Sequence, residues 1–220
     1  MNADQPTLPK ILVLASGSGT NFQALVDASR ERDFPGQVIA LGCNQPKAFA
    51  LERAAQANIE TFVVDHKGFG SRDEFDAALI AHILRYSPDV IVLAGFMRIL
   101  TPSFVQAFRG KLLNIHPSLL PKYTGLNTHQ RALDAGDNTH GVSIHFVTEE
   151  LDGGPVIAQA EVSVMPDDTS ESLAEKVQLK EHLLYPIVVR WFCEGRIQLG
   201  SDYVLFDGQV MEKPMRLSDS

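Results

Sequence analysis

The sequence predicts a Rossmann-like α/β fold, in which an open, mostly parallel sheet is flanked by helices and continues into antiparallel strands in its C-terminal part. Short, continuous apolar runs recur through the first half of the chain, which is typical of strands buried on both faces of a parallel sheet. Amphipathic stretches lie between these runs, and alternation of strands with helices indicates a doubly wound sheet. Beyond residue 115 the apolar runs partly alternate with polar residues, which favours antiparallel or mixed strands.

The composition is that of one globular domain. The chain has 220 residues, of which 45% are hydrophobic and 21% are charged, so it can bury a full core. We expect residues 1–9 to be a short flexible segment and residues 10–220 to form a single domain. A formal net charge of −8 disfavours binding to nucleic acid, and no apolar run approaches the ~20 residues of a membrane helix. The start of the chain is unlike a signal peptide, and the two distant cysteines, Cys43 and Cys193, fit a cytoplasmic protein.

The first half of the chain supplies the predicted parallel strands and two helices. Phe22, Leu25 and Val26 follow the i, i+3, i+4 spacing of a helix that begins after the first strand. The same spacing predicts a second helix over residues 71–85. The predicted strands are the five apolar runs 11–14, 38–41, 62–64, 90–94 and 112–115.

The second half predicts two partly alternating strands, a long helix and a hairpin. The strands cover residues 142–147 and 156–162, with a turn near Asp152-Gly153-Gly154. The long helix is expected to begin at a capping arrangement of Asp168 with Glu171. Pro186 is expected to kink or break that helix. Near the C-terminus, Asp207-Gly208 lies between short apolar runs and indicates a hairpin turn.

A glycine-rich loop follows the first predicted strand, at residues 16–21. Glycines let backbone N–H groups approach an anion, and the start of the following helix favours negative charge. The loop alone is equally compatible with a plain turn. A dinucleotide site is disfavoured, because Phe22 replaces the third glycine and Gly42-Cys43-Asn44 has no acidic residue for a ribose. We therefore expect a monophosphate if an anion binds here.

A polar pair ends the fifth predicted strand. Asn114 interrupts an apolar run, and His116 lies two residues further on, so both side chains point to the same side. Ligands of open α/β sheets bind at the carboxyl ends of the strands. An amide and an imidazole together suit an oxyanion that develops beside a proton transfer. A polar strand end capped by Pro117 explains the same residues equally well without any catalysis.

A third candidate is Asp152 in the predicted turn 152–154. A carboxylate on such a loop could raise the pKa of a neighbouring histidine or orient a water molecule, although Asp-Gly-Gly most often forms only a turn. A supporting role is possible for His145, which lies close to Asp152 in sequence. No histidine shows metal-ligand spacing such as His-Glu-x-x-His, so no metal is expected.

Together these stretches resemble the phosphoribosylglycinamide formyltransferases, a family of folate-dependent enzymes of purine synthesis. The resemblance covers about residues 10–195. It rests on four motifs in a fixed order: Ser16-Gly-Ser-Gly-Thr-Asn21, Ala94-Gly-Phe-Met-Arg-Ile-Leu100, Asn114-Ile-His-Pro-Ser-Leu-Leu-Pro121 and Leu151-Asp-Gly-Gly-Pro155.

The resemblance implies that a formyl group passes from 10-formyltetrahydrofolate, a co-substrate, to the amine of glycinamide ribonucleotide. Asn114 would hold the formyl oxygen, His116 would be the general acid, and Asp152 would raise the pKa of His116. The implied halves are about 10–110 for the nucleotide phosphate and about 111–195 for folate and catalysis, with a hairpin tail at 196–220. The implied glycinamide ribonucleotide contacts are Gly19, Thr20, Asn21, Gln178 and Glu181. The implied folate contacts are Arg72, Met97, Arg98, Ile99, Leu100, Asn114, Thr148, Glu149, Glu150, Leu151 and Asp152.

Three alternatives remain open at this point. A 10-formyltetrahydrofolate hydrolase shares the catalytic residues but usually has an added N-terminal domain. A methionyl-tRNA formyltransferase usually has an added C-terminal RNA-binding domain. A non-catalytic phosphate-binding module would use the glycine loop alone. The expected partners are small molecules, with no nucleic acid and no membrane, and the expected state is a monomer or a homodimer. Thr124 departs from the proline found in many relatives, which leaves the stiffness of that loop open.

Overall fold

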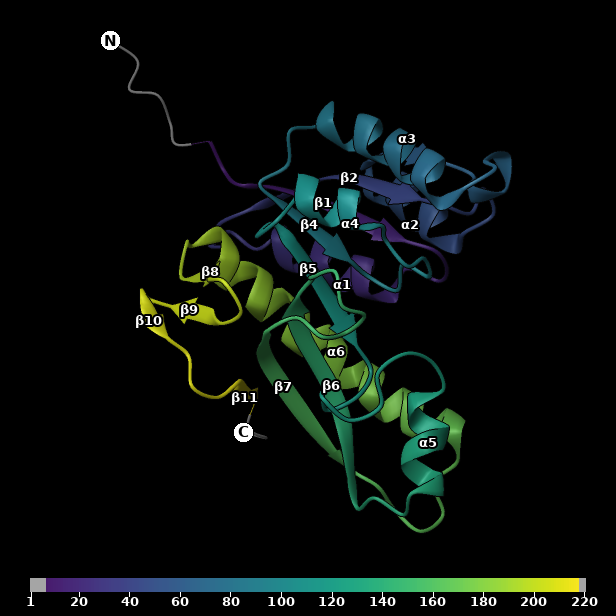
Figure 1. Ribbon diagram of the computed structural model, residues 1–220, viewed down its shortest axis with the longest axis vertical. Helices are drawn as coiled ribbons and strands as arrows, with labels where there is room; N and C mark the ends of the chain where they lie inside the picture. The colour runs from purple at the N-terminus through teal and green to yellow at the C-terminus, as the bar shows by residue number, and fades with distance from the viewer. Residues whose placement is uncertain (1–6, 218–220) are drawn as a thin grey trace.

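The protein is built around a twisted eight-stranded sheet with helices on both faces (Figure 1). A computed structural model describes residues 7–217. The strand order is β11-β7-β6-β5-β4-β1-β2-β3, and a separate three-stranded sheet has the order β10-β9-β8.

The first part of the chain contributes β1 (Lys10–Ala15), α1 (Thr20–Ser29), β2 (Gln37–Cys43), α2 (Phe49–Ala57), β3 (Glu60–Val63), the 3₁₀ turn η1 (His66–Gly68), α3 (Arg72–Leu84), β4 (Val90–Leu93) and α4 (Pro102–Ala107). The remainder contributes β5 (Leu112–His116), α5 (Thr128–Asp134), β6 (Thr139–Phe146), β7 (Val156–Ser163), α6 (Ser170–Cys193), β8 (Ile197–Leu199), β9 (Val204–Phe206), β10 (Gln209–Val210) and β11 (Met215–Leu217).

Two apolar cores lie on opposite faces of the sheet. Successive side chains of a strand point to opposite faces, so Ile11 and Val13 belong to one core whereas Leu12 and Leu14 belong to the other. The first core is closed by α1, α2 and α6 and contains the fully buried Tyr185. The second core is closed by α3 and α4. This double coverage explains why the strand sequences are continuously apolar.

The predicted fold is confirmed. Strands β1 to β5 pair in parallel, and β6 is antiparallel to both β5 and β7. The predicted hairpin is formed by β9 and β10, which pair in antiparallel fashion across Asp207 and Gly208. The sheet also has a feature that was not predicted. The short strand β11 adds in parallel to β7, with Met215 opposite Ala158.

The long helix differs from its prediction at Pro186 and at its N-cap. Pro186 is expected to kink or break the helix, but it does not break α6, which continues for 24 residues. A proline within a helix costs about 3 kcal/mol, and the buried residues Tyr185, Val188 and Val189 beside it anchor the helix on the sheet and outweigh that cost. The N-cap is Thr169, which forms a capping box with Ser172 rather than the predicted arrangement of Asp168 with Glu171.

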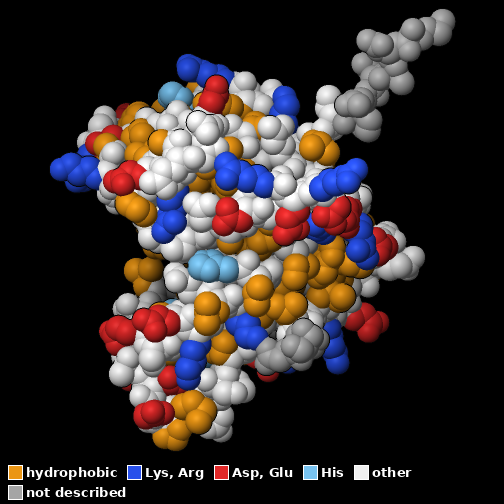
Figure 2. All heavy atoms as spheres, turned by 180° about the vertical axis from the view of Figure 1, so that it is seen from behind, with side chains coloured by type: hydrophobic (Ala, Val, Ile, Leu, Met, Phe, Trp, Pro, Cys, Tyr) orange, Lys and Arg blue, Asp and Glu red, His pale blue; other side chains and the backbone are white. Residues whose placement is uncertain are grey.

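The outer face of α6 carries exposed hydrophobic side chains, among them Leu179 and Leu183. The view from behind shows a band of hydrophobic side chains with charges of both signs around it (Figure 2). Among residues 7–217 no helix is long and apolar enough to cross a membrane. The predicted flexible segment 1–9 lies mostly outside these described residues.

Candidate active site

The glycine loop connects β1 to α1 at the carboxyl edge of the sheet. Gly19 has a φ of 72°, and a Cβ added to it would lie 2.6 Å from the Cβ of Ala50, so only glycine fits between the loop and α2. The carbonyls of Gly17 and Ser18 accept hydrogen bonds from the Ala50 N–H at 3.0 Å and from Arg53 Nε at 2.8 Å. These bonds turn the loop carbonyls toward α2. The first N–H groups of α1 have no partner within the helix, and N–H groups at a helix start are suited to an anion.

A cavity of about 350 Å³, here called the nucleotide-side pocket, lies in front of this loop. Asn21 Nδ2 donates to Glu181 Oε2 at 2.7 Å, and Gln178 Nε2 donates to Thr20 Oγ1 at 3.3 Å, so α6 is tied to the start of α1. The five residues implied as glycinamide ribonucleotide contacts all line this pocket. Three of them are in the glycine loop and α1 and two are in α6, which is at least 157 residues further along the chain. The five residues are Gly19, Thr20, Asn21, Gln178 and Glu181.

The polar groups of the nucleotide-side pocket are incompletely satisfied. Burial raises the pKa of Glu181, and the hydrogen bond from Asn21 opposes that shift. Within the described part of the chain, Asn21 Oδ1 is buried without a hydrogen-bond partner. A buried acceptor without a donor costs about 1–3 kcal/mol, which a ligand that brings hydroxyl or amine donors would recover.

The second candidate, Asn114 with His116, lies at the end of β5, and Asp152 lies opposite. His116 Nδ1 is 3.4 Å from Asp152 Oδ2, and both side chains are buried, with 7% and 8% of their surface exposed. His116 Nε2 donates to the carbonyl of Tyr123 at 2.8 Å. Both ring nitrogens of His116 therefore face acceptors.

Asp152 is held in an unusual backbone conformation. Its φ is 52°, in the left-handed region that aspartate tolerates better than most residues. The N–H of Gly125 donates to Asp152 Oδ2 at 2.8 Å, so the carboxylate also ties down the segment after β5. Strained backbone of this kind persists where the surrounding contacts enforce it and is often found at functional sites.

His145 orients the amide of Asn114. Burial lowers the pKa of His145, and its Nδ1 bonds to the carbonyl of Phe146 at 2.9 Å. A neutral ring that donates through Nδ1 must accept through Nε2, so Asn114 Nδ2 donates to it at 3.0 Å. A β-bulge between Ile144 and His145 sets the direction of the histidine, and the sequence gives no signal for it.

A cavity of about 110 Å³, here called the folate-side pocket, opens beside Asn114 and Asp152. Of the implied folate contacts, Met97 lines the nucleotide-side pocket instead, and Arg72, at the start of α3, lines neither. The sequence did not point to the apolar wall formed by Leu93, Phe96 and Val105, because these residues look like ordinary core positions. The implied residues that line the folate-side pocket are Arg98, Ile99, Leu100, Asn114, Thr148, Glu149, Glu150, Leu151 and Asp152.

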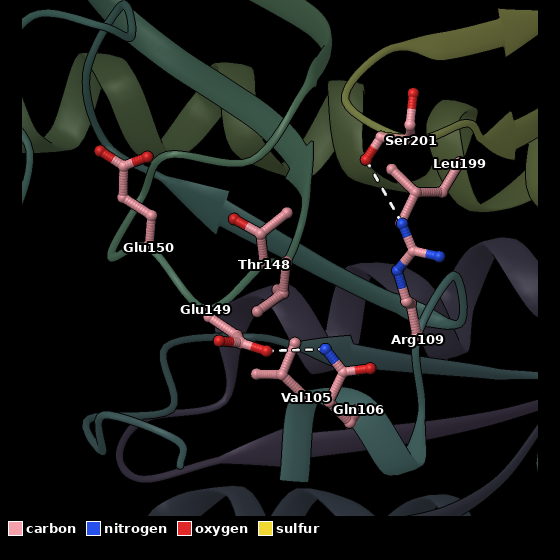
Figure 3. Close-up of a pocket in the computed structure, with 9 residues that line it drawn as sticks. Val105, Gln106, Arg109, Thr148, Glu149, Glu150, Leu199 and Ser201 are labelled. Carbon is pink, nitrogen blue, oxygen red and sulfur yellow. Dashed lines mark hydrogen bonds between the residues drawn. The ribbon is translucent and has the colours of Figure 1, made fainter. Parts of the chain in front are cut away.

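Thr148, Glu149 and Glu150, in the loop between β6 and β7, line both this pocket and a third cavity of about 290 Å³, which is drawn in Figure 3. Glu149 points toward α4, where its Oε1 accepts a hydrogen bond from Gln106 Nε2 at 2.6 Å. On the opposite side of the cavity, Arg109 donates to the carbonyl of Ser201 at 3.3 Å. The Glu149 contact fixes the loop that carries Asp152. Among residues 7–217, no group of three or more His, Cys, Asp or Glu side chains is placed to hold a metal ion.

Comparison with known proteins agrees with this geometry. The profile of the Formyl transferase family matches residues 9–189. The phosphoribosylglycinamide formyltransferase of Escherichia coli K12 is 52% identical over 90% of this chain and 94% of its own length. That of Haemophilus influenzae is 46% identical over 94% of this chain and 97% of its own.

Solved structures give the same result. The phosphoribosylglycinamide formyltransferase of Coxiella burnetii, in complex with CHES, superposes with a TM-score of 0.91 at 46% identity and covers 96% of this chain and 100% of its own. Glycinamide ribonucleotide transformylase 1 of Symbiobacterium toebii superposes with a TM-score of 0.89 at 40% identity, over 94% and 98% of the two chains. At this identity and coverage, the chain is a member of the formyl transferase family and, within it, of the phosphoribosylglycinamide formyltransferases.

Proposed function

We propose that this enzyme transfers the formyl group of 10-formyltetrahydrofolate to the amino group of glycinamide ribonucleotide, giving formylglycinamide ribonucleotide and tetrahydrofolate. One observation carries the proposal: the two pockets meet at the end of β5. Asn114 and Asp152 line the folate-side pocket, and Ile115 and Pro117, on either side of His116, line the nucleotide-side pocket. A donor and an acceptor bound in these pockets would meet at His116.

The proposed chemistry is a direct attack of the amine on the formyl carbon. The new C–N bond converts the formyl oxygen into an oxyanion, which would accept hydrogen bonds from Asn114 Nδ2 and from protonated His116. His116 then supplies the proton that the departing folate nitrogen needs as its C–N bond breaks, and the proton that the attacking amine loses passes to His116 and replaces it. Asp152 would stabilise the charged imidazole at 3.4 Å and assist this proton transfer. The scheme uses no enzyme nucleophile and no metal.

The substrate contacts are proposed from the two pockets. The phosphate would bind to N–H groups at Gly19, Thr20 and Asn21, where the helix dipole favours an anion. Glu181 would accept hydrogen bonds from ribose hydroxyls, with Gln178 beside it. The folate ring would bind between the loop 97–100 and the loop 148–152, with Arg72 placed to meet a more distant, anionic part of the molecule.

A direct assay tests this function. Purified enzyme is mixed with 10-formyltetrahydrofolate, and the release of tetrahydrofolate is followed by absorbance with and without glycinamide ribonucleotide. We expect turnover only when the nucleotide is present, together with formylation of its amine in the product. Equal turnover without the nucleotide would identify a hydrolase instead. Binding of both ligands without turnover in either reaction would identify a non-catalytic module.

A further inference from the structure

A buried chain of hydrogen bonds beneath the two pockets has no part in the proposed mechanism. The hydroxyl of Ser16 donates to Asn44 Oδ1 at 2.6 Å and accepts from the N–H of Met97 at 2.8 Å. The N–H of Ser16 donates to the carbonyl of Gly95 at 3.1 Å, so Ser16 holds the segment 95–97 by two hydrogen bonds. Asn44 is 1% exposed and Ser16 is 8% exposed. Bonds this well shielded from water hold their geometry.

The chain of bonds links loops that follow four different strands. Ser16, Asn44 and Met97 follow β1, β2 and β4, which are neighbours in the sheet. His66, in the turn after β3, continues the chain, because its Nδ1 lies 2.8 Å from the carbonyl oxygen of Asn44. The chain therefore spans the carboxyl edge of the sheet from β4 to β3.

The direction of each bond is fixed by chemistry. A carbonyl oxygen only accepts, so the single proton of the Ser16 hydroxyl must point to Asn44 Oδ1, whereas the Met97 N–H can only donate. The lone pairs of the hydroxyl are consequently turned to Met97. Loss of Asn44 would free the hydroxyl to rotate and would weaken the bond to Met97, although Asn44 does not touch Met97 directly.

The segment held by Ser16 is the wall between the two pockets. Gly95, Met97 and Ser16 itself line the nucleotide-side pocket. Phe96 and Arg98, which alternate with them in the chain, line the folate-side pocket. A shift of Met97 would therefore reshape both pockets at once, and the loop that begins at Ser16 leads directly to the phosphate-binding turn.

We propose that Ser16 and Asn44 are positioning residues that couple the two substrate pockets by fixing the wall at residues 95–98. This inference rests on the proposed function, because it assumes that the pockets hold the nucleotide and the folate. Because the bonds of Ser16 hold residues 95–98 as one unit, a ligand that contacts one face of the wall also sets the position of the face that lines the other pocket. Coupling of this kind is reciprocal, so each ligand strengthens the binding of the other by the same factor.

Calorimetry on the enzyme and its variants tests the coupling. The affinity for glycinamide ribonucleotide is measured with and without saturating tetrahydrofolate, which has no formyl group to transfer. We expect tetrahydrofolate to tighten nucleotide binding at least about fivefold in the unaltered enzyme, and this ratio to fall toward one in Ser16→Ala and in Asn44→Ala. Ser29→Ala, at the end of α1 and outside both pockets, is the matched control and should keep the full ratio.

Kinetics separate positioning from catalysis and from misfolding. In both variants the KM for each substrate should rise about fivefold or more, while kcat stays within about twofold of the unaltered enzyme. The double variant should be no worse than Ser16→Ala, because both changes break one chain of bonds. Ser16→Thr keeps the hydroxyl and should restore part of the coupling. Hydrogen exchange at the Met97 amide should accelerate in Ser16→Ala and in Asn44→Ala but not in the control.

The possible failures are distinguishable. If the unaltered enzyme shows no turnover with both substrates, the proposed function itself fails. If it turns over but its affinities for the two ligands are independent, or if Ser16→Ala leaves coupling and both KM values unchanged, only the present inference fails. Slow exchange at Met97 in Ser16→Ala would also overturn it, because the bond from Ser16 would then not hold the wall.

Discussion

At the scale of single residues, the site depends on how protons are distributed among three buried side chains. His116 has an acceptor at each ring nitrogen, whereas His145 is neutral and accepts from Asn114. Both histidines lie close to Asp152. Burial lowers the pKa of His145, which accepts a hydrogen bond from Asn114, whereas both ring nitrogens of His116 face acceptors. The identity of these residues could be foreseen from the sequence, but their hydrogen-bond partners could not, because these include the backbone carbonyls of Tyr123 and Phe146, whose directions depend on the local path of the chain.

The first prediction concerns Asp152. Asp152→Asn keeps the size of the side chain but removes the negative charge that faces His116. We expect kcat to fall about 10²- to 10⁴-fold, the usual contribution of a general acid, with a much smaller change in KM. His116→Ala should lose a similar factor, and the double variant should be no slower than either single variant. Steady-state kinetics with both substrates check this, and a variant of either residue that retains the original kcat contradicts the assignment.

A second prediction concerns Glu181, whose pKa is raised in the folded protein mainly by burial. An acid whose pKa is higher in the folded than in the unfolded protein stabilises the fold when it is protonated. Its stabilising contribution is complete below the unfolded value near 4.5 and is lost as the pH rises through the folded pKa. Glu181→Gln resembles the protonated acid, so it should unfold at a higher temperature than the unaltered enzyme at neutral pH.

The difference between Glu181→Gln and the unaltered enzyme should vanish at pH 4 and below. Thermal unfolding without ligands, measured across this pH range, checks the expectation. Glu175→Gln, an exposed position on the same helix, is the control and should show no such trend. A pH-independent difference for Glu181→Gln would indicate altered packing rather than the loss of a buried charge.

At the scale of elements, the loop between β6 and β7 carries Asp152 and is held by side-chain hydrogen bonds at two points. Glu149 anchors it on α4 through Gln106, and Asp152 anchors it on the segment after β5 through the Gly125 N–H. Both glycines of this loop are tightly packed, since a Cβ added to Gly154 would lie 1.8 Å from the carbonyl oxygen of Phe146 at the end of β6, and one added to Gly153 would lie 2.5 Å from the side chain of Glu150. A sequence motif that most often marks a plain turn therefore forms a fitted wall of the pocket.

A third prediction tests the anchor on α4. Gln106→Ala removes the donor to Glu149 and should loosen the loop on the folate side. A hydrogen bond to a carboxylate contributes about 1 kcal/mol at an exposed position, so the KM for 10-formyltetrahydrofolate should rise about fivefold. The KM for glycinamide ribonucleotide should change little. Gln130→Ala removes a comparable exposed bond, to Asp134 on α5, and should change neither value. Equal effects on both substrates would contradict a local anchor.

At the scale of the whole molecule, one side chain connects the long helix with the strands that carry the site. Tyr185 of α6 is fully buried, and its hydroxyl lies 3.0 Å from both the Leu93 and the Leu113 carbonyls. These carbonyls belong to β4 and β5, next to the loop 95–98 and to Asn114. Pro186 is tolerated beside Tyr185 because this part of α6 is held by the sheet rather than by its own helical bonds alone.

The fourth prediction follows from this contact. Tyr185→Phe removes the single hydroxyl proton that the two buried carbonyls share and should lower the free energy of unfolding by about 1–3 kcal/mol. For a domain of this size, the melting temperature should fall by about 2–4 °C per kcal/mol. Because the ring is retained, the fold and the KM values should be preserved. Chemical denaturation and thermal unfolding measure the loss, and unchanged stability would mean that the hydroxyl contributes nothing.

The sheet and its flanking helices could be predicted from the sequence, because continuous apolar runs and helical spacing are local signals. Polar residues at the end of an apolar run drew attention to Asn114 and His116, but the sequence alone explained them equally well as a plain strand end, and Asp152 as a turn residue. The sequence could not foresee the bond between Ser16 and Asn44, which joins the ends of different strands. It also missed the capping box at Thr169 and Ser172, where several adjacent polar residues compete for the same position. The weakest signal was that of β11, whose three residues have too little apolar character to predict a strand.

The strand β11 has a consequence for how the molecule behaves at high concentration. An uncovered outer strand offers a row of free backbone groups to any other extended chain, and β7 is eight residues long. By pairing with residues 158–160, β11 occupies the middle of that row, and Arg216 adds an ion pair with Glu161. The opposite margin is the four-residue strand β3, too short to serve as a good template and headed by Glu60. Both edges of the sheet are thus protected against pairing with another molecule. The β7 edge is covered by β11, and the β3 edge is short and begins with a charged residue.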